Sequence, residues 1–262
     1  MNKFVYLAIL IIFASCDGYQ KVLKSTDIDY KFSEAKRYYQ EEEYYKALPI
    51  LDELQIVLKG TDRSEEVDYL LAYTHYGLKS FNLASYHFTN FYRRYPASKH
   101  AEELDFMSAL CFYFQSPKSS LDGLNTQRAI DQLQSFIDRN PESEKIERCN
   151  ELIDDLTQKL KDKSYNIAKL YYDIEDYKAA ITALNNVLVD YPSINNADEI
   201  QFLILDSNYK LATNSVASKK IERFNNTIAS YYYFIDLYDS SDRMDDAQKI
   251  FEKSNQQLEI LQ

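Results

Sequence analysis

Glycine and proline are scarce in this sequence, which has four glycines and five prolines among 262 residues. The glycines stand alone, so no glycine-rich loop of the kind that holds phosphates is present. No segment alternates apolar and polar residues over more than a few positions, as a half-buried strand does. These absences exclude a phosphate-binding loop and leave helices as the expected structural element.

The sequence also lacks a catalytic or metal-binding motif. Its three histidines, His75, His87 and His100, are 12 and 13 residues apart and have no HExxH or Cys-x-x-Cys companion. We expect His75 to be an interior or groove residue and the acidic run 41–43 to be a solvated turn. An envelope hydrolase that uses a carboxylate pair stays a rival interpretation, but no motif supports it. We therefore predict a protein that is not an enzyme and that holds no cofactor and no metal.

Positive charge is in deficit, since 30 lysines and arginines face 41 acidic residues and the net charge is −11. Such a surface repels the phosphates of nucleic acids and of anionic lipids. Nucleic acid is therefore excluded as a partner, and binding to other proteins becomes the expected activity.

The first 16 residues have the layout of a secretory signal peptide. Lys3 gives a positive start, residues 4–13 form an unbroken apolar run, and two small residues precede Cys16. Ten apolar residues are too few for a helix that spans a membrane, which needs roughly 20. The pattern therefore indicates export and not a transmembrane anchor.

The end of this signal, residues 13–16, resembles a bacterial lipobox, although its first residue is phenylalanine where leucine is usual. We predict that residues 1–15 are removed, that Cys16 carries the lipid anchor and that residues 16–27 form a lipidated linker. Several acyl chains give stable membrane binding, whereas one chain gives only marginal binding. Asp17 bears on the choice of membrane, because an acid at this place retains lipoproteins in the inner membrane of some bacteria.

The two other cysteines, Cys111 and Cys149, fall at apolar or semi-apolar positions of helical patterns. A buried, inert thiol is the common fate of such a residue. A disulfide between them stays an alternative, because an exported protein enters a compartment that permits it.

Four segments of the chain can be laid over one another, residues 32–60, 69–96, 106–141 and 165–192. Each has a small residue in its first helical stretch and another in its second, followed by two large apolar residues. The small residues are Ala35, Ala72, Ala109 and Ala168, then Ala47, Ala84, Ala129 and Ala180. The large residues are Leu51, Phe88, Leu133 and Leu184, then Leu54, Phe91, Phe136 and Val187. A proline that ends the second helix follows in three segments, as Pro96, Pro141 and Pro192. This spacing in a unit of roughly 34 residues is the tetratricopeptide pattern, and an ordinary helical bundle is the alternative.

The repeats predict an all-α fold, a superhelical array of about five tetratricopeptide-like helical hairpins with a C-terminal capping helix. Residues 28–141 would form units 1–3, and residues 142–262 would form units 4 and 5. An insert around residues 116–120 would be a surface loop of the third unit. The absence of a helix breaker from residue 143 to residue 172 predicts one long connecting helix.

A degenerate fifth unit follows the fourth. We expect its helices at residues 197–212 and 219–238, separated by a polar loop near residues 215–218. The capping helix would cover residues 242–261, because a terminal repeat departs from the pattern where one of its faces meets water.

A tyrosine stands four residues after the first small residue of the four units, and also four residues after Leu205, which we count as the equivalent of Ala168 in the fifth unit. Counted in this way, the ladder consists of Tyr39, Tyr76, Tyr113, Tyr172 and Tyr209. The first helices line the concave side of a helical array, and tyrosine gives a large contact area at low entropy cost. Because tyrosine also packs well between helices, a purely structural ladder stays the alternative.

The first two units have the richest cluster of such residues. The candidate peptide-binding groove consists of Lys36, Tyr39, Tyr69, Tyr73, Tyr76 and Tyr113.

Over nearly its whole length the chain resembles the BamD family of outer-membrane protein assembly lipoproteins, in its tyrosine-rich, Bacteroidota-like branch. The likeness lies in the lipobox at Cys16, in residues 19–26 (YQKVLKST), 44–48 (YYKAL) and 91–96 (FYRRYP), in the insert with Ser116-Pro117, and in the long helix between the third and fourth units.

The resemblance implies a lipid-anchored protein on the periplasmic face of the outer membrane. Its C-terminal repeats would dock onto the periplasmic domains of the BamA insertase, and its N-terminal repeats would receive unfolded barrel precursors by a terminal targeting segment. Replacing Tyr39 and Tyr76 with alanine would then weaken precursor capture and leave docking intact. Another periplasmic tetratricopeptide lipoprotein adaptor, serving cell division or polysaccharide export, is the alternative of the same class.

Overall fold

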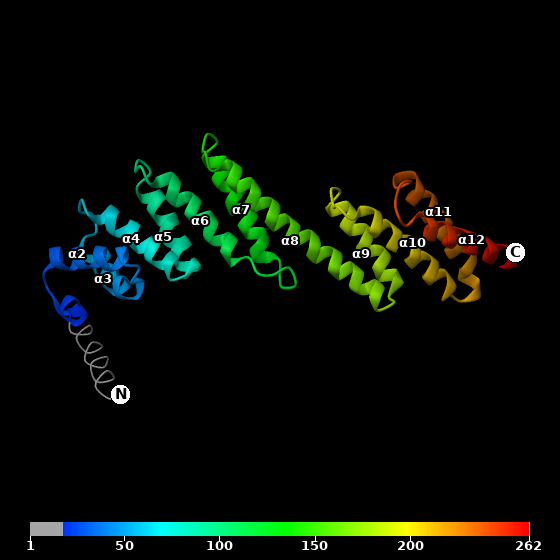
Figure 1. Ribbon diagram of the computed structural model, residues 1–262, viewed down its shortest axis with the longest axis horizontal. Helices are drawn as coiled ribbons and strands as arrows, with labels where there is room; N and C mark the ends of the chain where they lie inside the picture. The colour runs from blue at the N-terminus through cyan, green and yellow to red at the C-terminus, as the bar shows by residue number, and fades with distance from the viewer. Residues whose placement is uncertain (1–17, 262) are drawn as a thin grey trace, which may run out of the picture. The chain divides into compact units, whose positions relative to one another are not determined.

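The computed structural model describes residues 18–261 and is helical throughout this part, with no strand in it (Figure 1). Residues 18–24 form a short helix ahead of the repeats. The helices that follow are α2 (Ile28–Gln40), α3 (Tyr44–Val57), α4 (Ser64–Gly77), α5 (Phe81–Arg94), α6 (Ala101–Gln115), α7 (Leu124–Arg139), α8 (Ile146–Asp173), α9 (Tyr177–Asp190), α10 (Ala197–Thr213), α11 (Ala217–Leu237) and α12 (Met244–Leu261). No helix of the described residues is long and apolar enough to span a membrane. The predicted signal peptide and Cys16 lie outside the described residues.

The chain forms two compact units, which are described separately below. The first unit ends at Leu156 and the second begins at Thr157, so the division falls inside α8. The repeat pattern places the end of the third repeat earlier, at residue 141. Contacts within the first unit continue past that point because α8 begins by packing its Cys149, Leu152 and Leu156 onto the third hairpin.

Consecutive helices pair into hairpins, with α2–α3, α4–α5 and α6–α7 in the first unit. In the second unit the C-terminal half of α8 pairs with α9, and α10 pairs with α11. The small and large apolar residues at repeated positions are all buried, none of them more than 3% exposed. The predicted all-α array of tetratricopeptide-like hairpins is confirmed, because these residues are where one helix of each hairpin packs onto the other.

The ends of the second helices follow the prolines. Helices α5, α7 and α9 each end two residues before their proline, at Arg94, Arg139 and Asp190. A proline has no amide hydrogen to continue the helix and restricts the residue before it. The same local rule therefore sets the length of three helices.

The turn inside a hairpin is the same in three of the repeats. Glu42, Lys79 and Glu175 each lie seven residues after the first small residue and have φ values of 57°, 58° and 65°. This left-handed conformation is costly for a residue with a side chain. In the third hairpin an insert replaces this turn, and residues 116–123 form the loop between α6 and α7.

The long helix predicted over residues 143–172 is α8, which has 28 residues. The fifth hairpin and the last helix begin and end within about two residues of their expected positions. Helix α12 packs on α10 and α11 and closes the second unit.

A polar residue is buried near the start of several first helices, four residues before the small residue. In the first unit these residues form ion pairs with the second helix of the same hairpin. The Nζ of Lys31 lies 2.6 Å from Glu53, Asp68 lies 2.5 Å from Arg94, and Asp105 lies 2.6 Å from Arg139. The equivalent residue of the fifth hairpin is an uncharged glutamine, Gln201, which is also buried. The first unit is therefore held by ion pairs that each have one buried and one exposed member, as well as by its apolar core.

Candidate peptide-binding groove

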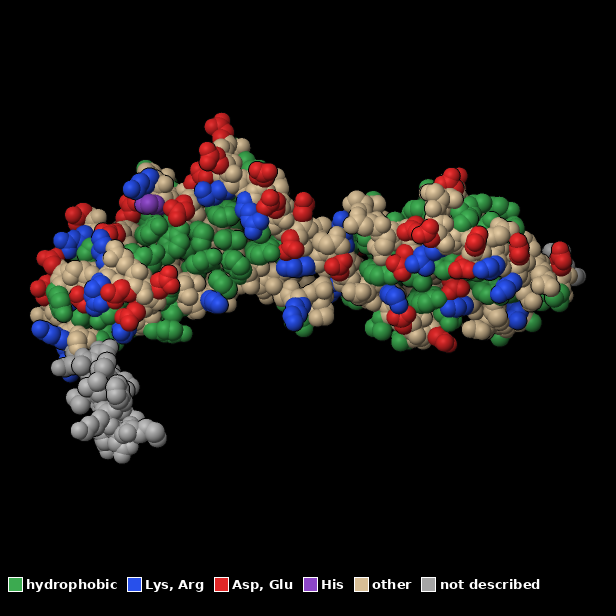
Figure 2. All heavy atoms as spheres, in the orientation of Figure 1, with side chains coloured by type: hydrophobic (Ala, Val, Ile, Leu, Met, Phe, Trp, Pro, Cys, Tyr) green, Lys and Arg blue, Asp and Glu red, His purple; other side chains and the backbone are tan. Residues whose placement is uncertain are grey.

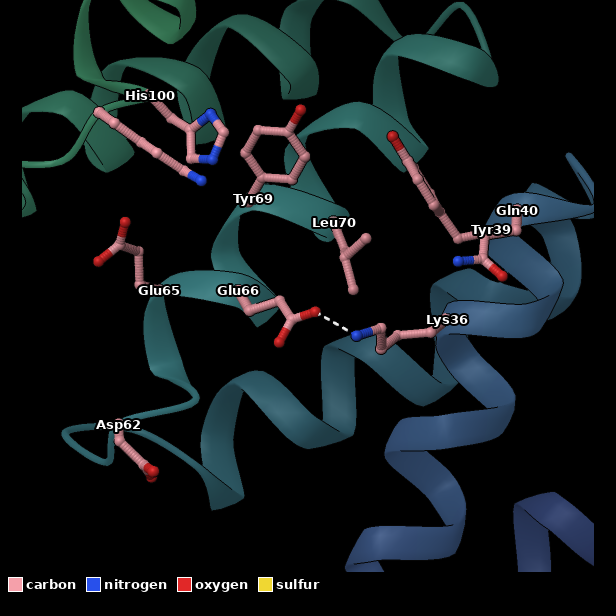
Figure 3. Close-up of a pocket in the computed structure, with 10 residues that line it drawn as sticks. Lys36, Tyr39, Gln40, Asp62, Glu65, Glu66, Tyr69, Leu70 and His100 are labelled. Carbon is pink, nitrogen blue, oxygen red and sulfur yellow. Dashed lines mark ion pairs between the residues drawn. The ribbon is translucent and has the colours of Figure 1, made fainter.

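A cavity of about 510 Å³ opens between α2, α4 and the turn before α6. Lys36 and Tyr39 line it from α2, Tyr69 lines it from α4, and His100 lines it from the turn (Figure 3). Tyr39 and Tyr69 stand on either side of Leu70, and the ring of His100 lies beside that of Tyr69, with centroids 4.8 Å apart. Three predicted site residues, Lys36, Tyr39 and Tyr69, therefore line the same cavity, together with the ring of His100.

Charges of both signs surround this cavity. Lys36 forms an ion pair with Glu66 at 2.5 Å, which the dashed line of Figure 3 marks. Glu65 accepts a hydrogen bond of 2.6 Å from the hydroxyl of Ser98. Lys99 is exposed at the rim. A peptide backbone or a terminal charge would meet both donors and acceptors here, around an apolar floor.

Burial raises the pKa of the Tyr39 hydroxyl to about 12, and the neighbouring hydroxyl of Tyr69 adds to the effect. The pKa of Tyr69 is raised as well, first by burial and then by the charge of Glu103. Both groups are therefore protonated near neutral pH and act as neutral hydrogen-bond donors and acceptors.

An aromatic band continues from the cavity along the first unit. Ring centroids are 4.8 Å apart from Tyr69 to Tyr73, 6.5 Å from Tyr73 to Tyr76, 6.2 Å from Tyr76 to Phe114 and 5.6 Å from Phe114 to Tyr113. Figure 2 shows hydrophobic side chains gathered in this region, over α4 to α7. Aromatic contacts of this length are favourable and rigid, so the band is a preformed apolar surface.

The six predicted groove residues thus divide into two groups. Lys36, Tyr39 and Tyr69 line the cavity, whereas Tyr73, Tyr76 and Tyr113 belong to the band beside it. The hydroxyl of Tyr73 donates a short hydrogen bond to Glu103, and burial raises its pKa.

Three of the ladder tyrosines, Tyr39, Tyr76 and Tyr172, also have a packing role. The rings of Tyr39 and Tyr76 meet the first aromatic residue of the next helix edge to face, at 5.9 Å and 5.8 Å. In the second unit Tyr172 meets Tyr177 in the same way at 6.1 Å. The ring at this position therefore joins the two helices of its hairpin, as the structural interpretation of the ladder requires.

The hydroxyls of the ladder differ from one repeat to the next. Among residues 18–261, no protein group hydrogen-bonds the hydroxyl of Tyr39, Tyr76 or Tyr209. The hydroxyl of Tyr113 donates to Asp155 at 2.9 Å, and that of Tyr172 donates to Asp206 at 2.5 Å. In the candidate groove the first two ladder hydroxyls are therefore available to a ligand.

Sequence reasoning missed Lys99 and His100, which complete the cavity from the turn between the second and third hairpins. A signal was present in the repeat register, because these two residues stand 37 positions after Asp62 and Arg63, in the equivalent turn. Turns between repeats reach the same edge of the groove as the first helices. Comparing the repeats at those turns would have found both residues.

The remaining histidines do not line the groove; His75 is buried and His87 is half-buried. His75 is buried and stacks on His87 with ring centroids 4.8 Å apart, and its Nδ1 has no hydrogen-bond partner among the described residues. Burial lowers the pKa of His75, and burial with the neighbouring His75 lowers the pKa of His87 to about 4. The described residues contain no cluster that could hold a metal ion.

Cys111 and Cys149 are free and buried, so the alternative of a disulfide between them is wrong for this structure. Burial raises the pKa of the Cys111 thiol to about 12 and that of the Cys149 thiol to about 11. Both are therefore thiols and not reactive thiolates.

No curated protein matches the chain. A family model does match it, over residues 26–224, and is described as YfiO, outer membrane lipoprotein. The match covers most of the chain, from just before α2 into α11, and includes every residue of the candidate groove. The chain therefore belongs to the YfiO family of outer membrane lipoproteins, to which the BamD-like proteins that it resembles also belong.

Proposed function

We propose that this protein is a non-catalytic subunit of the machinery that assembles β-barrel proteins in the outer membrane. The first unit binds unfolded barrel precursors, and the fourth and fifth repeats dock on a BamA-type insertase. The match to an outer membrane lipoprotein family over residues 26–224 carries the general role. The aromatic groove of the first unit is the observation that carries precursor binding.

The chemistry of the groove fits such a ligand. A barrel precursor ends in an alternating, aromatic strand whose backbone groups are unpaired before insertion, and a surface with hydrogen-bonding groups can hold it. The rings from Tyr69 to Tyr113 offer a preformed apolar surface, and the free hydroxyls of Tyr39 and Tyr76 offer bonds to the peptide backbone. Rigid aromatic contacts lose little side-chain entropy on binding.

The groove would hold its ligand without enclosing it. The cavity is shallow and open, and its one central ion pair, Lys36 to Glu66, is partly exposed. Exposed ion pairs contribute little to affinity. Weak binding suits a delivery step, because the precursor must pass on to the insertase.

The lipid on Cys16 would hold the protein at the periplasmic face of the outer membrane. Residues 16–27 would then link the anchor to the first hairpin, which begins with Asp27 as the N-cap of α2. This places the precursor groove in the half of the protein nearest the anchor in sequence.

The deciding experiment is affinity purification of the full-length, lipidated protein from its own membranes, with its partners identified by mass spectrometry. We expect a large β-barrel protein with periplasmic repeat domains in near-stoichiometric amount. A preparation that retains other envelope proteins but lacks this partner would contradict the proposal. The function would then move to another periplasmic adaptor, of cell division or polysaccharide export.

A further inference from the structure

The fourth hairpin carries an exposed apolar stripe along the last turns of α8 and on Ile174, the first residue after that helix. Ile167, Leu170, Tyr171 and Ile174 are 47, 57, 38 and 62% exposed. Their spacing of three and four residues places them on one face of the helix. A connected stripe of this kind marks a surface that packs against another element.

The equivalent positions in the second, third and fifth hairpins are closed. One residue before the small residue, Leu71, Ser108 and Ile204 are 0, 4 and 4% exposed, whereas Ile167 is 47% exposed. Two residues after it, Thr74, Cys111 and Ser207 are all 0% exposed, whereas Leu170 is 57% exposed. The same two positions of the repeat are therefore open in the fourth hairpin and buried in the second, third and fifth.

The second helix of the preceding hairpin closes these positions elsewhere. Helix α3 packs on α4, α5 packs on α6, and α9 packs on α10. The second unit begins inside α8, so within this unit no second helix precedes the fourth hairpin. We call the uncovered face of α8 and α9 the open edge.

A free end of a repeat array is normally polar, because it meets water. The first hairpin obeys this rule, since its residues at the two positions are Glu34 and Arg37, which form an ion pair of 2.6 Å. The last helix is mostly polar as well and exposes Lys253, Gln256 and Glu259, with Ile260 as an exposed apolar residue beside them. The open edge has isoleucine and leucine instead, so its composition is that of an interface and not of a solvated end.

A shallow hollow of about 450 Å³ lies beside the stripe. Tyr171 lines it from α8, and Ala179, Thr182, Ala183 and Asn186 line it from α9. Most of these side chains are small, so the hollow has room for a side chain from a helix that lies along the edge.

We propose that the open edge binds an amphipathic α-helix of another protein, which takes the place of the missing preceding helix. The edge continues the hairpin-to-hairpin interface of the second unit, and the equivalent edges of the second, third and fifth hairpins are each covered by a helix. The three covering helices, α3, α5 and α9, have 14 residues each, so the partner helix has about four turns.

The contact face of the partner is apolar, with residues spaced by three and four. Ser108 of the third hairpin bonds to Thr89 of its covering helix through hydroxyls 2.8 Å apart, but Ile167 offers no such group. This proposal goes beyond the function proposed above, because it does not depend on which protein supplies the helix.

The test is site-specific photocrosslinking of the full-length protein in its own cells. A benzophenone amino acid replaces Leu170, and in a control it replaces Tyr233 of α11, which is 56% exposed and so equally accessible. We expect Leu170 to give an adduct with a peptide of a different protein whose apolar residues recur at helical spacing. Adding Ile167→Glu and Ile174→Glu should lower the yield at least tenfold.

Several results would overturn the proposal. They are an adduct between two copies of this chain, a crosslinked peptide without helical spacing, the same peptide at equal yield from Tyr233, and no adduct at Leu170. The thermal midpoint of the double glutamate variant, followed by circular dichroism, should match that of the wild type; a large fall would show that the stripe is core. A partner helix from a protein other than the insertase would leave this proposal standing and contradict docking of the insertase at this edge.

Discussion

In the first unit, the ladder tyrosines Tyr39 and Tyr76 pack their rings within a hairpin and leave their hydroxyls without a protein partner. In the second unit, Tyr172 packs its ring in the same way, but its hydroxyl donates to Asp206 and accepts from Lys210 at 2.6 Å. The ammonium of Lys210 also lies 4.4 Å from the centroid of the Tyr172 ring. One repeat position thus presents a free hydroxyl at Tyr39 and Tyr76 and a closed polar network at Tyr172, while Tyr113 of the first unit also bonds an acid, Asp155.

The difference teaches that a repeated residue has a shared role and a local one. The ring position is shared, because it follows from the geometry of the hairpin. The use of the hydroxyl is local, because it depends on what the next first helix places opposite. Asp206 and Lys210 of α10 are in reach of Tyr172.

The largest expected effect tests the ion pairs of the first unit, each of which has one buried member. Asp105 is 4% exposed and accepts hydrogen bonds from Arg139 at 2.6 Å and from Asn140 at 2.9 Å. Since Arg139 is itself partly exposed, we expect Asp105→Ala to destabilise the first unit by about 3 kcal/mol. Hydrogen exchange of the first unit should rise, with the amides of the second unit unchanged. Asp138→Ala, which removes an exposed acid from α7, is the control. An equal rise in hydrogen exchange in both units after Asp105→Ala would contradict the expectation that the two units unfold independently.

Acid should also affect the stability of the two units differently, because all three histidines lie in the first unit. The pKa of His87 is lowered from 6.5 to about 4. Between these two pH values His87 is protonated in the unfolded chain and neutral in the folded chain, so acid favours unfolding. The contribution of neutral His87 to the free energy of unfolding is therefore complete above pH 6.5 and is lost as the pH falls towards 4. Allowing for partial exposure, we expect a loss of about 1–2 kcal/mol between pH 7 and pH 5.

The measurement is hydrogen exchange of each unit at the two pH values, corrected for the intrinsic exchange rate. His87→Gln should reduce the difference for the first unit. A loss of protection that is equal in both units would show that histidine burial is not its cause.

Deleting two hydroxyls tests directly whether the unpaired ladder hydroxyls serve a ligand and not the stability of the fold. Tyr39→Phe with Tyr76→Phe removes two unpaired hydroxyls and keeps both rings, so thermal stability should be unchanged. If these groups bond a precursor peptide, its affinity should fall roughly 3–10-fold, as for the loss of one or two hydrogen bonds. Fluorescence anisotropy with a labelled, aromatic-ended barrel peptide measures it. Alanine at these positions is a poorer test, because it also removes the ring contacts with Tyr44 and Phe81.

Tyr172→Phe is the matched control with the opposite expectation. It removes a hydroxyl that serves Asp206 and Lys210, so we expect a loss of about 1 kcal/mol in the second unit and no change in peptide affinity. If all three substitutions lower stability alike, the ladder is structural in both units and the groove assignment is wrong.

The smallest effect concerns a feature that the units share. Glu175 and Lys79 have φ values of 65° and 58° in equivalent turns. Because glycine adopts this conformation freely, Glu175→Gly and Lys79→Gly should each stabilise the protein by about 0.5–1 kcal/mol in thermal unfolding. Glu175→Ala, which keeps the backbone strain, should give no gain. Unequal gains from the two glycines would show that the turns differ.

The candidate groove was only partly predictable from the sequence. Lys36, Tyr39 and Tyr69 do line one cavity, because residues on the first helices of adjacent hairpins recur at a fixed register. Tyr73, Tyr76 and Tyr113 share that register but lie in the aromatic band instead. Register places a residue on a face, whereas the neighbours from other hairpins decide how much of it stays open.

The sequence by itself determined the hairpins. The recurring alanines, the large apolar residues and the prolines act within one repeat, and so helix periodicity and helix-ending rules define each hairpin without knowledge of its neighbours. The helices, the closing prolines and the long α8 all follow from these local rules.

Only the tertiary structure decided which repeated residues are free. The hydroxyl of Tyr39 is open and that of Tyr172 is bonded, and Leu71 is covered while its counterpart Ile167 is exposed. The physical reason is that exposure and hydrogen bonding depend on which helix packs alongside. That neighbour lies tens of residues away in the sequence and is absent where the second unit begins.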